Sequence, residues 1–364
     1  MSIYDYNQYR RNTRKIKVGD IYLGGDAPIA IQSMANAPAE DIGAVVSQCL
    51  ALQKAGCEIV RIAVPTVEAA RAIPAMKESG VTIPVVADIH YDYRIALECA
   101  SLGVDKIRIN PGNIGEDSRV KAVATACAAR NIPIRIGVNS GSLEKSVLEK
   151  YGAPTAEALA ESAMYHASLL EKFDFNDIII SIKASTPREM VRANRILAEH
   201  CDYPLHLGVT EAGGADMGRI KSAVGIGALL CDGIGDTIRV SLTADPTDEI
   251  GAAKAILRAS GCEAGANLNI VSCPTCGRTK IDLISLAAEL ERRAGELRLK
   301  RSMKVAVMGC AVNGPGEARE ADIGIAGGRG EAVLIRRGEI IRKIGEGDII
   351  EVLLNEIKKM QEIE

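Results

Sequence analysis

Residues 58–90 read EIVRIAVPTVEAARAIPAMKESGVTIPVVADIH and contain one unit that recurs along most of the chain. A run rich in β-branched residues (58–65) is followed by a segment whose apolar residues recur every three or four positions (67–79), and then by a second β-branched run (83–90). The two outer segments are typical of buried strands, and the middle one is typical of an amphipathic helix. The stretch therefore predicts a strand, a helix and a second strand in succession.

The same alternation continues through residues 28–259. Eight strand-like runs occur, at 28–34, 58–65, 83–90, 105–111, 132–140, 177–185, 204–213 and 237–243. Segments of helical period separate or follow them, at 41–55, 67–79, 117–130, 156–172, 188–200, 216–230 and 246–259. The strands lack the early Gly-x-Gly-x-x-Gly turn of a dinucleotide-binding sheet, so we expect an α/β fold in which residues 1–260 form a (β/α)8 TIM barrel.

The pattern changes after residue 260. A long amphipathic segment (282–299) and a strand-like run (303–309) precede three short strand-like runs, ADIGIAG, EAVLIRRG and EIIRKIG, and a final helical segment (348–362). This order predicts a second, smaller α/β domain over residues 261–364.

Bulk composition narrows the class of protein. A net charge of -3, with 47% hydrophobic and 25% charged residues, is typical of a soluble globular protein and gives no overall field to attract nucleic acid or an acidic membrane. The first residues are polar and basic, and no apolar run is long enough to span a membrane. We therefore expect a cytoplasmic protein whose ten cysteines do not form disulfides.

Polar residues gather near the carboxyl ends of the predicted barrel strands. Residues two apart on a strand face the same side, and the cations among these residues outnumber Asp88 and Glu211. For any one of them the alternative is an ion pair with a neighbouring helix. Together they predict a multiply charged anionic substrate, with a diphosphate first, because arginine forks match phosphate oxygens. The set comprises Arg61, Asp88, His90, Arg108, Asn110, Arg135, Asn139, Ser181, Lys183, His206, Glu211, Arg239 and Ser241.

Three cysteines in the second domain have the spacing of a metal site. Cys273 and Cys276 form a Cys-x2-Cys pair, and Cys310 opens the stretch CAVNGPGEA. A zinc site would need a fourth Cys or His nearby, and all four histidines lie in the barrel half. We therefore favour a [4Fe-4S] cluster whose fourth iron takes an oxygen ligand. Glu317 is our candidate for that ligand; the alternative is a solvated turn residue. A zinc-ribbon binding module joined to a barrel also remains open.

These stretches resemble a known family. SCPTC and GCAVNGPGEA, preceded by IQSM, ADIHYDYRIAL, IRINPGN, IRIGVNSGSL and HLGVTEAG, are similar to the 4-hydroxy-3-methylbut-2-enyl diphosphate synthase family over essentially the whole chain. The resemblance implies an iron-sulfur oxidoreductase of the methylerythritol phosphate pathway of isoprenoid biosynthesis. It would carry out the reductive ring opening and dehydroxylation of 2-C-methyl-D-erythritol 2,4-cyclodiphosphate, with electrons from flavodoxin or ferredoxin. The alternative is a non-redox iron-sulfur hydro-lyase acting on a phosphorylated substrate.

The resemblance also implies roles for individual residues. Glu211 resembles an acidic residue that helps to protonate or position the reacting carbons. Ala35, Asn36 and Ala37 stand where the family usually has Thr-Asn-Thr, which puts a hydroxyl contact there in doubt. The cluster ligands would be Cys273, Cys276, Cys310 and Glu317, and the diphosphate pocket would contain Arg61, His90, Arg108, Asn110, Arg135, Asn139, Lys183 and Ser241.

Barrel geometry predicts how the two domains cooperate. The eighth barrel helix runs toward the end of the barrel opposite the active face, so the second domain starts from the wrong end of its own barrel. We therefore expect a head-to-tail homodimer with an active site shared between chains, which the resemblance also implies. The basic stretch RRGEIIRK (336–343) is a candidate surface for an acidic flavodoxin; the alternative is a solvated strand edge.

Overall fold

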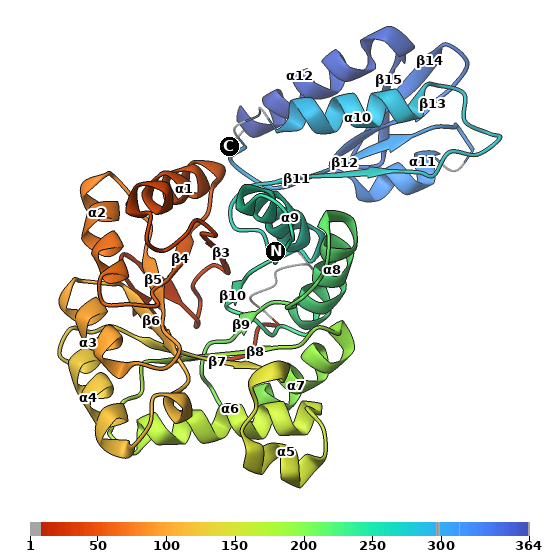
Figure 1. The fold of residues 1–364 in the computed structure, drawn as a ribbon. Coiled ribbons are helices and arrows are strands. Elements are labelled where there is room, and N and C mark those ends of the chain that lie inside the picture. Colours follow the sequence, from red (N-terminus) through yellow and green to blue (C-terminus); the bar gives the residue numbers. More distant parts are fainter. Residues whose placement is uncertain (1–8, 296, 298, 313, 363–364) are drawn as a thin grey trace. The chain divides into compact units, whose positions relative to one another are not determined.

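The computed structural model describes residues 9–295, 297, 299–312 and 314–362, and the side chain of Glu317 lies outside that description. The chain divides into two compact units, with the boundary between Glu263 and Ala264 (Figure 1). No helix in these ranges is both long and apolar enough to pass through a membrane.

The first unit is an eight-stranded parallel barrel. Its sheet order is β8-β7-β6-β5-β4-β3-β10-β9, and the bridge between Ile180 and Leu205 joins the two ends, β8 and β9. The predicted TIM barrel is therefore confirmed. Every predicted strand is present but shorter, with bounds β3 Ala30–Met34, β4 Ile59–Ala63, β5 Val85–Asp88, β6 Lys106–Ile109, β7 Ile134–Asn139, β8 Ile178–Lys183, β9 His206–Leu207 and β10 Thr237–Ile238.

Helices surround this barrel (Figure 1). Several begin at the capping residues that the sequence provides: the side chain of Asp41 accepts from the backbone of Ala44, and Asp245 accepts from Thr247 beside Pro246 at the first helical turn. The helices α3 and α5 are additional to the predicted segments. The bounds are α1 Ile42–Ala55, α2 Ala72–Glu78, α3 Tyr93–Ser101, α4 Asp117–Ala128, α5 Lys145–Tyr151, α6 Ala156–Glu171, α7 Pro187–His200, α8 Ala215–Cys231 and α9 Pro246–Ala259.

A hairpin that was not predicted from the sequence covers the end of the barrel at which the strands begin, which we call the lower end. Strands β1 (Ile16–Val18) and β2 (Ile21–Leu23) pair antiparallel. Their buried side chains form one apolar cluster with residues from the inner faces of β3, β4, β5 and β8. We call this cluster the apolar plug; its buried members are Ile16, Val18, Leu23, Ala30, Ile59, Val86 and Ile179.

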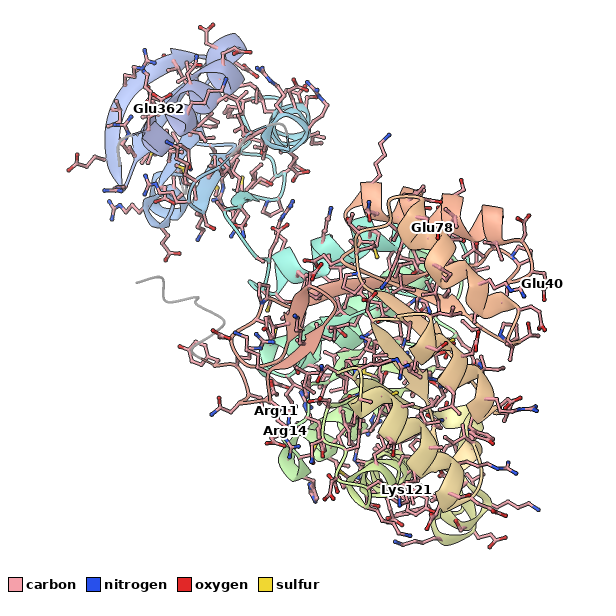
Figure 2. The ribbon with its side chains drawn as sticks, turned by 90° about the vertical axis from the view of Figure 1, so that its left-hand side faces the viewer. Arg11, Arg14, Glu40, Glu78, Lys121 and Glu362 are labelled. Atoms are coloured by element: carbon pink, nitrogen blue, oxygen red, sulfur yellow. The ribbon has the colours of Figure 1, made fainter. Side chains whose placement is uncertain are left out.

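The segment before the hairpin is fixed to distant parts of the barrel. Arg10 pairs with Asp236 at 2.7 Å, and both side chains are almost completely buried. Arg11 and Arg14, labelled in Figure 2, both reach Tyr203: Arg11 donates to its carbonyl, and the guanidinium of Arg14 lies 4.3 Å from its ring centroid. The N-terminal segment is thus part of the barrel unit.

The second unit is built on a five-stranded sheet. Its strands are β11 Leu268–Ser272, β12 Met303–Met308, β13 Ile323–Gly327, β14 Glu331–Arg336 and β15 Glu339–Gly345, in that order; the first three are parallel and the last two form an antiparallel hairpin. Helices α10 (Leu283–Ala294) and α12 (Ile349–Glu362) pack on one face. The short α11 (Gly314–Glu317) precedes Ala318, which packs on the other face. The predicted helix over 282–299 is too long, since α10 stops at Ala294 before Gly295.

Candidate functional site

Charged side chains line the barrel lumen toward the carboxyl ends of the strands. Arg108 on β6 stands in register with Asp88 on β5 and with Arg135 on β7, so the three side chains share the inner face. Asn139 on β7 is likewise in register with Lys183 on β8. Parallel pairing therefore brings together residues that are far apart in the sequence.

Asp88 organises two of the arginines. Its carboxylate lies 3.1 Å from Nη1 of Arg108 and 3.7 Å from Nε of Arg61, and its side chain is buried. Burial alone would raise the pKa of Asp88, but the charges of Arg61 and Arg108 hold it below its usual value. The carboxylate is therefore ionised and fixes both guanidinium groups in the lumen.

Gly137 on β7 makes room for Arg108. Arg108 donates through Nη2 to the Gly137 carbonyl at 2.8 Å, and the backbone N–H of Gly137 donates to the side chain of Asn110 at 2.9 Å. A Cβ at residue 137 would lie only 2.5 Å from Nε of Arg108. A side chain at this position would therefore displace Arg108.

Glu249, on α9, is a second carboxylate that the sequence analysis missed. It lies 3.2 Å from Nε of Arg239 and accepts a hydrogen bond from Ser33 at 2.7 Å. The sulfur of Met34 accepts from Arg61 at 2.7 Å and from Arg239 at 3.5 Å, so these two cations meet at one side of the lumen. Glu249 lies in the first turn of α9, after the cap residue Asp245, and the sequence alone does not pair it with Arg239 or Ser33.

Cations remain in excess. Arg135 is 1% exposed, and its Nε and Nη1 have no hydrogen-bond partner among the described residues. Burial, with repulsion from neighbouring arginines, holds the pKa values of Arg135 and Lys183 well below their usual ranges. Among the described residues of the lumen, Asp88 and Glu249 thus face six basic side chains, those of Arg61, Lys106, Arg108, Arg135, Lys183 and Arg239. Such a lumen suits an anion with several negative charges.

The other predicted residues lie at the rim. His90 is exposed just past β5, whereas Asn139 at the end of β7 and Ser241 after β10 are half-buried. Glu211 is exposed, with a φ of 51°. The predicted strand over 204–213 is wrong beyond Leu207, because β9 contains only His206 and Leu207, and Glu211 therefore sits on a loop. His206 is completely buried, with its Nδ1 against the hydroxyl of Thr237.

His166 on α6 joins two loops of the mouth, and this role was not predicted from the sequence. Its Nδ1 accepts from the backbone N–H of Gly112 at 3.1 Å, in the loop after Asn110. Its Nε2 contacts the carboxylate of Glu144, in the loop after Asn139. Burial alone would raise the pKa of Glu144, but His166 and the backbone lower it to about 2. The loops that follow β6 and β7 are therefore joined through one imidazole.

The three cysteines of interest lie in loops of the second unit. Cys273 directly follows β11, and Cys310 comes two residues after β12, the neighbouring parallel strand. The N–H of Gly309 donates to the sulfur of Cys273 at 3.3 Å, and the N–H of Cys276 donates to the Thr279 hydroxyl at 3.2 Å. The Gly309 carbonyl accepts from Lys280 at 2.9 Å, which closes the 273–280 loop against the end of β12.

These cysteines share one edge of the sheet without converging on one point. Cys276 is exposed, and Cys273 and Cys310 are half-buried. Within the described ranges, no three His, Cys, Asp or Glu side chains are arranged to hold a single metal ion. Glu317 belongs to α11 by its backbone, and its side chain lies outside the described part of the chain.

Two solved structures resemble part of this chain. A dihydropteroate synthase from Stenotrophomonas maltophilia has a TM-score of 0.51 at 13% identity, covering 69% of this chain and 100% of that chain. One from Coxiella burnetii has a TM-score of 0.50 at 13% identity, covering 68% and 99%. At this level of identity the likeness shows the shared fold alone.

Sequence comparisons extend over both units. Residues 13–254 match the family model described as the GcpE TIM-barrel domain, and residues 269–359 match the GcpE protein C-terminal domain. A relative from Ruminiclostridium cellulolyticum is 56% identical over 351 residues, covering 96% of this chain and 98% of its own, and one from Clostridium perfringens is 56% identical over 349 residues, covering 96% and 99%. Both are named 4-hydroxy-3-methylbut-2-en-1-yl diphosphate synthase (flavodoxin). These matches support the synthase and not the hydro-lyase, and the chain belongs to the GcpE family of 4-hydroxy-3-methylbut-2-en-1-yl diphosphate synthases.

Proposed function

We propose that this chain makes 4-hydroxy-3-methylbut-2-enyl diphosphate by reductive ring opening and dehydroxylation of 2-C-methyl-D-erythritol 2,4-cyclodiphosphate, a step of isoprenoid biosynthesis. The observation that carries the proposal is the excess of basic side chains in the barrel lumen, where, among the described residues, two carboxylates face six of them. A cyclic diphosphate offers several phosphate oxygens to these donors.

The lumen binds the diphosphate. Arg61 and Arg108 are already oriented by Asp88, so little side-chain freedom is lost when they meet phosphate oxygens. Arg135 and Lys183 supply further donors from β7 and β8. At the rim, the polar side chains that contact the rest of the substrate are His90, Asn110, Asn139 and Ser241.

Glu211 is the acid at the mouth. It stands on the loop after β9, exposed and in a left-handed backbone conformation. A non-glycine residue with positive φ is uncommon, and such residues occur often at functional sites. We assign to its carboxyl group the protonation or positioning of the reacting carbons.

Cys273, Cys276, Cys310 and Glu317 hold a [4Fe-4S] cluster. Their chemistry fits: three thiolates and one carboxylate, with the Gly309 N–H already donating to one sulfur at 3.3 Å. Each cysteine binds a different iron in such a cluster, which agrees with three sulfurs that do not converge on a single ion. When bound, the cluster supplies electrons one at a time together with a Lewis-acidic iron. Glu317 is the weak ligand, which leaves that position exchangeable.

Electrons come from flavodoxin or ferredoxin. The relatives carry flavodoxin in their names, and the edge strand β15 presents exposed Ile340 and Ile341 beside the basic Arg342 and Lys343.

The active enzyme is a head-to-tail homodimer. Helix α9 begins at the mouth, where Glu249 meets Arg239, and runs for 14 residues away from it, so the chain leaves the barrel at the opposite end.

One preparation tests the cofactor and the reaction together. Anaerobically purified protein should be brown, with an absorption band near roughly 400 nm, and should convert the cyclodiphosphate only when reduced flavodoxin is supplied. Colourless protein with stoichiometric zinc would overturn the cluster, and turnover without reductant would indicate a hydro-lyase.

Glu317→Ala should keep some cluster on three cysteines, lose most activity and become more sensitive to oxygen. Full activity in this variant would remove Glu317 from the mechanism.

A further inference from the structure

Lys106 is the basic residue of the lumen to which the site described so far gives no individual role, and it lies at the start of β6, two residues before Arg108. Its side chain is completely buried (0% exposed), and Nζ has no hydrogen-bond partner among the described residues. Other buried polar atoms on the barrel strands also lack a hydrogen-bond partner among the described residues: both side-chain polar atoms of Gln32, Oγ of Ser181 and Nε2 of His206. A buried amine without a partner is unfavourable in a protein interior, so it calls for a function.

The register places Lys106 between the apolar plug and the mouth. It stands beside Val86, a member of the plug, whereas Arg108, two residues later on the same inner face, stands beside Asp88. Two residues advance a strand by about 6.6 Å, a rise that the four-carbon stem of lysine can span. Because the plug is apolar, polar partners for the amine come from the side of the arginines.

We propose that Lys106 is a further substrate-binding residue, forming the floor of the anion pocket and taking up one proton from solvent as the diphosphate enters. The protonated amine then donates to a phosphate oxygen from beneath, while the arginines hold the diphosphate from the sides. This assignment rests on the proposed function, because it requires that the cyclodiphosphate occupies this lumen.

The charges of the lumen favour an amine that changes its protonation state. The arginines stay protonated in proteins, so only the lysines and His206 can adjust the total charge. Burial is the main cause that lowers the pKa of Lys106 well below its usual range, and repulsion from Arg135 and Arg61 lowers it further. An arriving dianion opposes both effects. Arg135 on β7, Arg61 on β4 and His206 on β9 interact electrostatically with Lys106. The other titratable and charged groups of the lumen are Asp88 on β5, Arg108 on β6, Lys183 on β8, and Arg239 with its partner Glu249.

Calorimetry of the oxidised holoenzyme, without reductant and hence without turnover, tests the assignment. Titrations with 2-C-methyl-D-erythritol 2,4-cyclodiphosphate are made at one pH in two buffers of different ionisation enthalpy, which gives the number of protons taken up. Lys106→Met should bind at least about tenfold more weakly, the loss of one charge-assisted contact, and should take up fewer protons than wild type by as much as one. Lys106→Gln should behave in the same way.

The stability of the ligand-free variant separates this role from a structural one. Lys106→Met replaces an unpaired buried amine by an apolar side chain, so its thermal midpoint should equal or exceed that of wild type while binding is weakened. The matched control is Lys121→Met, on the exposed side of α4 (Figure 2), which should leave affinity and proton uptake unchanged. Unchanged affinity or unchanged proton uptake in both Lys106 variants would overturn the assignment. Failure of wild type itself to bind the cyclodiphosphate would instead overturn the proposed function.

Discussion

The barrel mouth and the cysteine edge of the second unit are assembled in different ways. In the mouth, Arg108, Arg135 and Lys183 stand on strands whose pairing fixes them, and their side chains are buried. At the cysteine edge, Cys273 and Cys276 lie on a loop, and Cys276 is exposed. The mouth is therefore organised by the fold itself, whereas the cysteine edge depends on the group that it is proposed to hold.

This contrast shows where folding stability is given up for function. Among the described residues, the mouth contains buried basic atoms without a hydrogen-bond partner, which is unfavourable until an anion arrives. The cysteine edge gives up little, since Cys276 is exposed and Cys273 and Cys310 are only half-buried. Mutations in the two regions should therefore have opposite effects on stability and similar effects on turnover.

The largest effect should come from disabling one region in each of two chains. Lys183→Ala and Cys310→Ser should each reduce turnover to background when tested alone. After subunit exchange, mixed dimers should restore up to about a quarter of wild-type sites, because half of the dimers are mixed and each then contains one complete site. Turnover measured before and after exchange gives the result.

The matched control for this mixture is Cys231→Ser, at an exposed cysteine at the end of α8, which should be fully active in any combination. Exchange can be verified, for example, by mass spectrometry of differently tagged chains. If turnover does not recover once exchange has been verified, each site is built within one chain.

A smaller effect should follow from removing one cation of the mouth. Arg135→Met should weaken cyclodiphosphate binding by about 1.5–3 kcal/mol, the range for one lost hydrogen bond to a charged group, and leave the cluster spectrum unchanged. Its free energy of unfolding should not fall, because two unpaired buried donors disappear. Calorimetry and urea unfolding measure the two quantities.

Arg130→Met, at an exposed position just beyond α4, is the comparison for Arg135→Met and should change neither quantity by more than about 0.5 kcal/mol. A changed cluster spectrum combined with normal affinity in Arg135→Met would place this arginine outside the substrate pocket.

The smallest effect should come from the link between the loops of the mouth. The pKa of Glu144 is lowered from 4.5 to about 2, so its ionised form stabilises the fold fully above pH 4.5, and this contribution is lost as the pH falls toward 2. Glu144→Gln should therefore be about 1 kcal/mol less stable than wild type at neutral pH, given that this side chain is 20% exposed. The difference should shrink as the pH falls.

Urea unfolding of the barrel unit between pH 3 and 7 measures this difference in stability. The control is Glu116→Gln, which removes another carboxylate from the loops at the carboxyl ends of the strands. A difference that stays constant across the range would mean that the ionised carboxylate of Glu144 is not what joins the loops.

The barrel was predictable because its strands are continuous β-branched runs with polar residues at their ends. The hairpin β1–β2 was not, since strands of three residues are too short to show a period. The position of Lys106 was available, because Lys106, Arg108 and Asn110 alternate on one strand, but only the register shows how deep it lies. Glu249 and His166 were hidden because their partners are brought near by the closing of the barrel.

The ion pair between Arg10 and Asp236 has a consequence for how this chain is made. Its two residues are separated by 226 positions, and Asp236 also accepts from the backbone of Leu205. At the usual rate of synthesis, Arg10 leaves the ribosome about 10–45 s before its partner exists. The segment around Arg10 is thus translated long before its partner and is among the last parts of the barrel unit to find its place. Until then the end of the barrel that the β1–β2 hairpin covers stays open, and its apolar lining is available to chaperones. A tag or truncation that reaches Arg10 should therefore lower the yield of folded protein more than the activity of the molecules that do fold.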